Sequence, residues 1–189
     1  MRHSAAARGE LSNPMPDTLL RADNQWRELH TLTLPPTIRD WLSDSGSLTA
    51  RLRRHGRFRV LPGASWSGVP EPEERHQLGH SGRHRALIRE VTLLLDEQPA
   101  VEARSVLPLT SLAGANRGLG HMGSRSLGSE LYRRPAARRA RVWVRHGLTP
   151  HGLGPCWGRQ SLFVKRNRPL LVAEYFLPGI WARLGEHDV

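Results

Sequence analysis

Two pairs of long apolar segments, each joined by a short polar turn, dominate the second half of this sequence. One pair comprises residues 85–95 and 100–107, and the other comprises residues 158–165 and 169–177. Strand-length segments joined by a few polar residues are typical of β-hairpins, whose two strands run antiparallel. The pattern therefore predicts an antiparallel sheet, which limits the fold to the classes that contain one.

Shorter segments carry the signals of helices and of additional strands. Helices are predicted at 35–42, 48–54 and 127–134, and strands at 57–61 and 141–145. Residues 62–82 are rich in proline and glycine and are predicted to form a long irregular loop. Together these elements predict an α+β fold, in which helices pack on one face of an antiparallel sheet.

The length of 189 residues suits a single domain. Residues 1–24 are polar and aperiodic and are predicted to be a flexible N-terminal arm, which leaves residues 25–189 as the folded domain. No apolar stretch approaches the roughly 18–20 residues of a membrane helix, and the first residues lack the apolar centre of a secretory signal. Because Cys156 is the one cysteine, no internal disulfide is expected, and the reducing cytoplasm is the expected compartment.

The charge of the chain is high and uneven. The net charge is +11, and only one of the 28 basic residues, Lys165, is a lysine. Residues 110–183 hold thirteen basic residues but only two acids, Glu130 and Glu174. Two explanations of this arginine bias stay open. One is codon usage in a GC-rich genome, and the other is recognition of carboxylates or phosphates by guanidinium groups. The densest run, residues 133–141, is interpreted as a solvated loop.

Motifs for metals and nucleotides are weak. His76, His80 and His84 have helical spacing, but Gly79 and Gly82 argue against a helix there, so no metal site is expected. The glycines of residues 118–123 do not follow a strand of a βαβ unit, so no nucleotide site is expected either. Cys156 is interpreted as a buried, unreactive thiol.

Glu174 is a carboxylate on a strand that is apolar on both faces. Its own face carries Leu170, Val172 and Phe176. A buried carboxylate costs several kcal/mol unless it is paired or protonated. Glu174 is therefore either an acid–base group or one half of a structural ion pair with an arginine of a neighbouring strand.

Arg89 and Arg104 are the corresponding basic residues on the preceding hairpin. Arg89 shares a face with Leu87, Val91 and Leu93, so it needs an anion, which would be Glu174 or a ligand carboxylate. Arg104 is a second candidate anion-binding residue. Its structural alternative is a cross-strand pair with Glu102 or Glu90.

Five segments of the sequence together resemble the chorismate lyase family in order and spacing. They are Leu87-Ile88-Arg89-Glu90-Val91, Arg104-Ser105-Val106-Leu107-Pro108, Ser126-Leu127-Gly128, Trp157-Gly158-Arg159 and Leu170-Leu171-Val172-Ala173-Glu174-Tyr175-Phe176-Leu177-Pro178. The resemblance covers roughly residues 35–180. The arm and the arginine run at 133–141 are not part of it.

The resemblance implies a carbon–oxygen lyase that eliminates pyruvate from chorismate and yields 4-hydroxybenzoate for ubiquinone biosynthesis, without a metal or a cofactor. It implies that Arg89 and the backbone N–H groups of Leu48 and Leu127 bind the ring carboxylate. Glu174 would meet the ring hydroxyl or the ether oxygen, and Arg104 would bind the enolpyruvyl carboxylate. The segments around Leu48 and Leu127 would act as lids over a buried ligand site.

Two other functions stay open at this stage. Effector domains of some transcription regulators are similar to this fold, although residues 1–34 are too short and aperiodic for the usual winged helix. A basic nucleic-acid-binding protein would explain the charge of +11, although Trp143 is one of few aromatic residues in the basic stretch. The expected partner is chorismate, with no nucleic acid and no membrane, and a monomer is expected.

Overall fold

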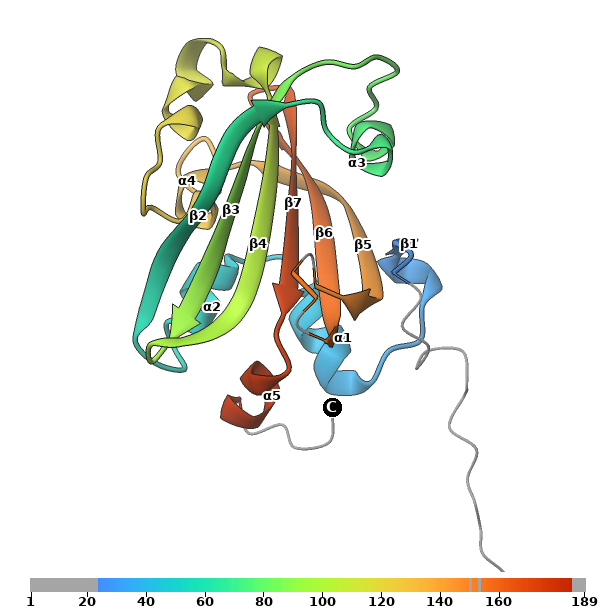
Figure 1. Cartoon of the computed structure of the whole chain (residues 1–189), viewed down its shortest axis with the longest axis vertical. Coiled ribbons are helices and arrows are strands. Elements are labelled where there is room, and N and C mark those ends of the chain that lie inside the picture. The colour runs from blue at the N-terminus through green and yellow to red at the C-terminus, as the bar shows by residue number, and fades with distance from the viewer. Residues whose placement is uncertain (1–23, 150, 153, 185–189) are drawn as a thin grey trace, which may run out of the picture.

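The computed structural model describes residues 24–149, 151–152 and 154–184. Their core is one antiparallel sheet of seven strands in the order β1-β5-β6-β7-β4-β3-β2 (Figure 1). The strands are β1 (Arg27–Glu28), β2 (Phe58–Gly68), β3 (Ala86–Leu95), β4 (Gln98–Pro108), β5 (Arg138–Leu148), β6 (Pro155–Lys165) and β7 (Arg168–Phe176). The predicted α+β fold with an antiparallel sheet is confirmed.

Both predicted hairpins are present and are closed by two-residue turns. Asp96 and Glu97 join β3 to β4, and Arg166 and Asn167 join β6 to β7. All four residues have positive φ angles, between 49° and 63°. Two successive left-handed residues match the right-handed twist of the flanking strands, so these turns hold the registers of both hairpins.

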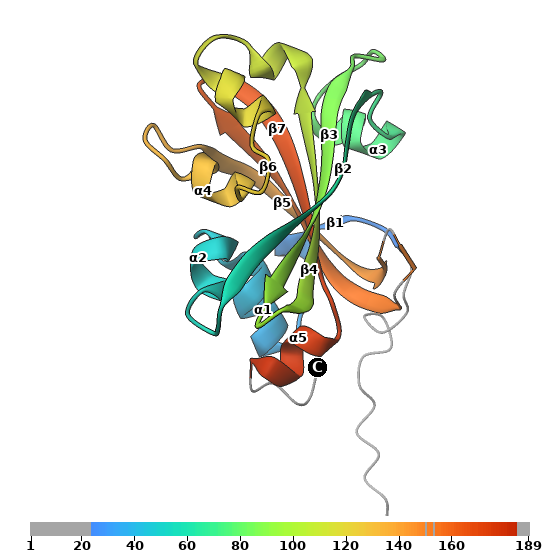
Figure 2. The same cartoon turned by 60° about the vertical axis from the view of Figure 1, so that its left-hand side comes forward.

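Short helices cover the sheet (Figure 2). The α-helices are α1 (Pro36–Ser43), α2 (Leu48–Leu52), α3 (Pro72–Gln77), α4 (Leu127–Leu131) and α5 (Gly179–Arg183), and the 3-10 helices are η1 (Leu29–Thr31), η2 (Leu109–Leu112) and η3 (Gly114–Gly120). We call the face covered by α1, α2, α4 and α5 the front face. Helix α3 packs on the opposite, back face. Within the described residues, no helix is long and apolar enough to cross a bilayer.

The main hydrophobic core lies between the front face and helices α1, α2 and α5. Helix α1 places Ile38, Trp41 and Leu42 on one side, as the i, i+3, i+4 spacing requires. The ring of Trp41 meets that of Phe176 edge-on at 6.3 Å, and Trp181 of α5 stacks on Phe176 at 5.7 Å. This core fills the end of the front face next to α5. The pocket lies farther along the same face, next to α4.

The loop prediction for residues 62–82 is wrong in two places. Strand β2 continues through Pro62 to Gly68, with a register shift between Pro62 and Ser65. An edge strand tolerates this proline because its missing N–H would face away from the sheet. Residues 72–77 form α3, which begins with a capping box between Glu71 and Glu74.

The arginine run is only partly a loop. Strand β5 begins at Arg138, so Arg138, Arg139 and Arg141 lie in the sheet and not in a solvated loop. Alternation along the strand leaves Arg138 exposed and turns Arg139 inward. The predicted arm, residues 1–24, lies outside the described residues except for Asn24.

Candidate functional site

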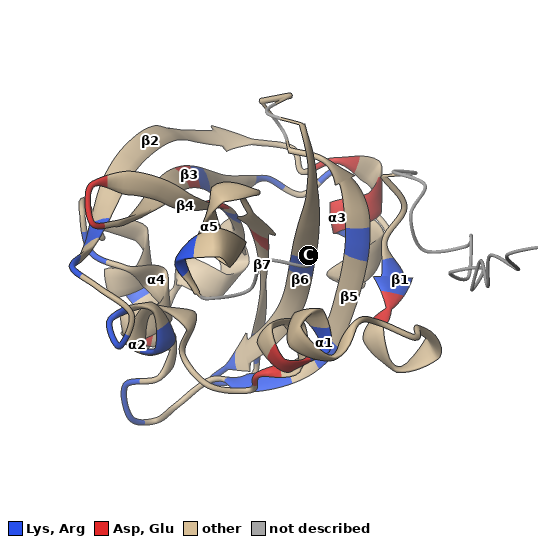
Figure 3. Ribbon diagram, turned by 90° about the horizontal axis from the view of Figure 1, so that it is seen from below, with Lys and Arg blue, Asp and Glu red and all other residues tan. Residues whose placement is uncertain are grey.

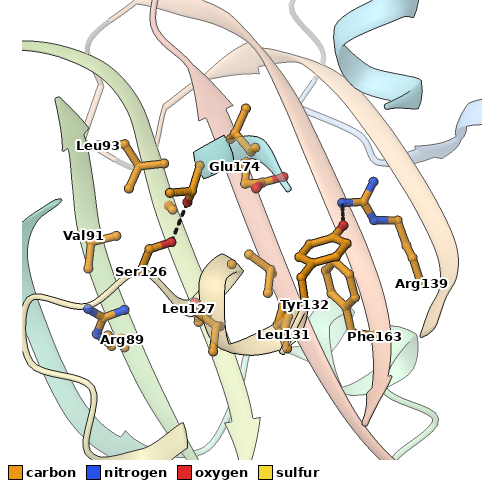
Figure 4. A pocket seen from close by; sticks show the side chains of 16 residues that line it. Arg89, Val91, Leu93, Ser126, Leu127, Leu131, Tyr132, Arg139, Phe163 and Glu174 are labelled. Carbon is orange, nitrogen blue, oxygen red and sulfur yellow. Dashed lines mark hydrogen bonds between the residues drawn. The ribbon is translucent and has the colours of Figure 1, made fainter. Parts of the chain in front are cut away.

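A pocket lies between the front face of the sheet and the first turns of α2 and α4 (Figure 4). The space between its side chains is about 500 Å³, counting the part that opens to solvent. Its floor consists of strand residues, namely Arg89, Val91, Leu93, Ala103, Ser105, Arg139, Phe163, Val172 and Glu174. Its cover consists of Leu48, Thr49, Ser126, Leu127 and Gly128. The lining is mainly apolar with a few charged groups, as small-molecule sites are.

Glu174 is held in this pocket by Arg159 of the adjacent strand. Nε of Arg159 donates to Oε2 of Glu174 at 2.8 Å, and Nη2 lies 2.7 Å from the same oxygen. Nη1 of Arg159 donates to the carbonyl oxygens of Trp41 and Asp44 at 3.1 and 3.0 Å. Arg159 is 1% exposed and lies beside Glu174 on the same face of the sheet, under α1, so this ion pair is fixed in position. The expected pair with an arginine of a neighbouring strand is therefore present, and Oε1 keeps no partner among the described residues, so the pairing leaves an acid–base role open.

Arg89 lies in the same pocket, but no carboxylate of the described residues pairs with it. Its Nη2 donates to the carbonyl oxygens of Gly123 and Arg125 at 2.6 and 3.0 Å. The residue is only 8% exposed, and this burial lowers the pKa of its guanidinium. A buried cation without a counter-charge is costly, so the site favours an anionic ligand here.

Leu48 and Leu127 open α2 and α4, and both line the pocket. The first N–H groups of a helix have no partner inside it. The hydroxyl groups of Thr49 and Ser126 share a hydrogen bond of 2.5 Å, which joins the two helix starts across the pocket. The structure thus brings Arg89, Glu174, Leu48 and Leu127 together, with the two expected lid segments in mutual contact.

Arg104 is not part of this pocket. Its neighbours Ala103 and Ser105 line the floor, and strand alternation turns Arg104 to the back face. There its Nε donates to Glu74 at 2.7 Å and its Nη1 donates to Glu90 at 2.9 Å. The expectation that Arg104 binds substrate beside Glu174 is corrected, and the alternative of a cross-strand pair with Glu90 is confirmed.

Arg139 and Tyr132 line the pocket, and the sequence analysis missed both. Arg139 was grouped with the exposed arginines around it. In the structure it pairs with Phe163 across β5 and β6, and paired residues share a face; no local signal in the sequence marks this pairing. Tyr132 follows α4, and its hydroxyl lies 2.7 Å from the carbonyl oxygens of Ser45 and Gly46.

The described histidines and Cys156 do not line this pocket. Within residues 24–149, 151–152 and 154–184, no group of three or more His, Cys, Asp or Glu side chains is placed to hold a metal ion. Cys156 is buried, which raises the pKa of its thiol to about 11. A thiol with this pKa is an unreactive core group at neutral pH.

Solved structures with the same fold include effector domains of transcription regulators. The effector domain of PhnF from Mycobacterium smegmatis has a TM-score of 0.56 and 15% identity, over 71% of this chain and 90% of that domain. The C-terminal domain of the histidine utilization repressor from Pseudomonas syringae has a TM-score of 0.52 and 10% identity, over 65% and 93%. At these identities the likeness concerns the fold alone.

Sequence comparison is more specific. A "Probable chorismate pyruvate-lyase" of Alcanivorax borkumensis is 59% identical over 165 residues, which are 87% of this chain and 81% of the relative. A protein of the same name from Thiobacillus denitrificans is 40% identical over 80% of this chain and 88% of its own length. The family model described as chorismate lyase matches residues 20–186. The family model and these relatives show that this chain belongs to the chorismate lyase family.

Proposed function

We propose that this protein converts chorismate to 4-hydroxybenzoate and pyruvate, and that the 4-hydroxybenzoate serves ubiquinone biosynthesis. One observation carries the proposal. Arg89, a buried guanidinium that no described carboxylate pairs with, lines the same pocket as the paired carboxylate Glu174. An aromatic product with a carboxylate at one end and a hydroxyl at the other matches this arrangement.

Arg89 and the two helix starts form the end of the pocket that would bind the ring carboxylate. The guanidinium offers N–H donors at Nε and Nη1, beyond Nη2, which donates to the carbonyl oxygens of Gly123 and Arg125. The N–H groups of Leu48 and Leu127 stand at helix N-termini, where the partial positive charge favours an anion. A carboxylate held by these three groups would be fixed in position and desolvated.

Glu174 would act on the part of the ring that reacts. The ring carbon that carries the hydroxyl loses its hydrogen, and the ether bond on the neighbouring carbon breaks, so that the ring becomes aromatic. Released enolpyruvate takes up one proton on carbon and becomes pyruvate. Glu174 would accept the hydrogen bond of the ring hydroxyl and carry the proton, while Arg159 balances its charge. The reaction transfers one proton from the ring carbon to the carbon of enolpyruvate without net oxidation or reduction, so it needs no redox cofactor.

The first test is an ultraviolet assay of the purified protein with chorismate, in which 4-hydroxybenzoate and pyruvate are both measured. We expect the two products in equal amounts and faster than the spontaneous decay of chorismate, which heat-denatured protein reports. A folded protein that releases neither product would overturn the proposal.

The alternative is a domain that binds its effector without turnover, and the likeness to regulator effector domains motivates it. It predicts that chorismate binds tightly and is recovered unchanged. Calorimetry with chorismate, followed by chromatography of the mixture, separates the two functions.

A further inference from the structure

Arg139 is a second guanidinium in the pocket that no carboxylate of the described residues pairs with. It lies at the end away from Arg89, with Glu174 between the two (Figure 4). It comes from β5, whereas Arg89 comes from β3 near the other edge of the sheet. The two cations are thus separated by the width of the pocket.

The contacts of Arg139 fix its position without neutralising it. Nη1 donates to the carbonyl oxygen of Asp44, and Nη2 donates to that of Gly46 at 3.4 Å and to the Tyr132 hydroxyl at 3.1 Å. Its guanidinium carbon lies 4.9 Å from the centre of the Phe163 ring. Nε is buried and has no hydrogen-bond partner in the part of the chain that the structure describes. Burial and the charge of Arg159 lower the pKa of Arg139, although Glu174, Tyr132 and Asp44 oppose this shift.

The charges around the pocket leave an excess of two positive charges. Arg89 and Arg139 line the pocket, Arg159 lies next to it against Glu174, and Glu174 is the one acid among the described lining residues. The carboxylate of nearby Asp44 is already bound, because Arg51 donates to it at 3.1 Å. An excess of two positive charges suits a ligand with two carboxylates.

We propose that Arg139 binds the second carboxylate of the substrate, that of the enolpyruvyl group. This proposal rests on the proposed function, since chorismate is the dianion concerned. Arg104 cannot take this role, because it lies on the back face between two acids. When the ether bond breaks, the second carboxylate leaves with pyruvate, and 4-hydroxybenzoate keeps only the carboxylate that faces Arg89. Arg139 therefore recognises the substrate and not the aromatic product.

The test compares substrate with product in the variant Arg139→Met. We expect kcat/KM for chorismate to fall by about 10- to 100-fold, as for a lost charge-assisted hydrogen bond. The Kd of 4-hydroxybenzoate, measured by calorimetry, should change by less than threefold (about 0.6 kcal/mol). The matched control is Arg138→Met, because Arg138 is the exposed neighbour on the same strand. It should leave both quantities unchanged.

Two results would overturn the proposal. An equal loss of affinity for substrate and product would show that Arg139 only holds the Asp44–Gly46 segment in place. An unchanged kcat/KM would place the enolpyruvyl carboxylate elsewhere. If Arg139→Met does not fold, Arg139→Gln keeps donors for the Asp44 and Gly46 carbonyls and allows the same comparison.

Failure of the proposed function is visible separately, because wild-type protein would then release no product. The Kd values of chorismate and 4-hydroxybenzoate for wild type and variant would still test the preference of Arg139 for the dianion.

Discussion

Arg104 of the back face and two arginines of the front-face pocket have opposite kinds of partner. On the front face, Arg89 and Arg139 donate to carbonyl and hydroxyl oxygens and have no carboxylate partner among the described residues. On the back face, Arg104 sits between Glu74 and Glu90, with contacts of 2.7 and 2.9 Å. Figure 3 shows acidic residues on α3, the helix that supplies Glu74.

The pKa values of these arginines follow the same division. Burial lowers the pKa of Arg89, and no neighbouring charge reverses the shift. Burial acts on Arg104 in the same direction, but the hydrogen bonds and charges of Glu74 and Glu90 raise its pKa above the ordinary value. An arginine whose charge is balanced inside the protein stabilises the fold, whereas an unbalanced one is available to a ligand.

The largest expected difference between the faces concerns Glu174 and Glu90. Glu174→Gln should lower kcat by about 10²- to 10⁴-fold, because the amide cannot carry the proton. Glu90→Gln, the matched change on the back face, should leave kcat within about twofold, since it lies outside the pocket. Steady-state assays of both variants test this. A Glu174→Gln protein that is folded and fully active would exclude Glu174 from the chemistry.

Removal of Arg104 should affect stability and not binding. Arg104→Met leaves Glu74 and Glu90 without their cation, and the expected loss of unfolding free energy is about 2–3 kcal/mol, because the pair is partly exposed. The Kd of 4-hydroxybenzoate should stay unchanged. Urea denaturation and calorimetry measure the two quantities. Weaker product binding without a loss of stability would contradict the structural role.

Removal of Arg89 should show the reverse pattern. Arg89→Met should weaken 4-hydroxybenzoate binding by about 10- to 100-fold, the value of a charge-assisted hydrogen bond. Stability should fall by less than about 1 kcal/mol, because the carbonyls that lose a donor belong to exposed Gly123 and Arg125 and can bind water. The same two measurements apply. A large loss of stability with unchanged affinity for 4-hydroxybenzoate would show that Arg89 stabilises the fold and does not bind the ligand.

Much of this division follows from strand alternation and could be read from the sequence. The pattern placed Arg89 with Val91 and Leu93, and Glu174 with Val172, and the structure confirms both faces. The same alternation separates Arg104 from Arg89, since paired Ser105 and Arg89 share a face. The strand pattern made Arg104 a candidate anion-binding residue and left a cross-strand pair open. Only the family resemblance implied that it binds the enolpyruvyl carboxylate.

Other features depend on contacts between distant segments, which local patterns do not carry. Glu74 reaches Arg104 only because residues 72–77 fold as a helix over the back face, within a segment predicted to be a loop. Arg139 has exposed arginine neighbours, so local composition hides its inward direction. The Thr49–Ser126 hydrogen bond joins residues 77 positions apart. Each contact needs the tertiary arrangement of the sheet.

The smallest expected effect is a pH dependence on the back face, where Glu102 is buried and its Oε2 has no hydrogen-bond partner within the described ranges. Burial raises the pKa of Glu102 above its ordinary value of 4.5, and Glu90 adds to the shift while His151 opposes it. The folded state therefore holds this proton more tightly than the unfolded state. Stability from this group is present below about pH 4.5 and is lost as pH rises through the higher pKa of the folded state.

Glu102→Gln removes this titration, so the variant should gain stability relative to wild type as pH rises above about 4.5. The gain should be smaller than the about 2–3 kcal/mol lost in Arg104→Met. Urea denaturation of both proteins between pH 4 and pH 8 measures the difference, with Glu97→Gln as the exposed control. A difference that stays constant or shrinks with rising pH would mean that Glu102 is ionised and satisfied in the fold. Glu102 would then be a carboxylate whose charge is balanced inside the protein, as Arg159 balances that of Glu174 on the front face.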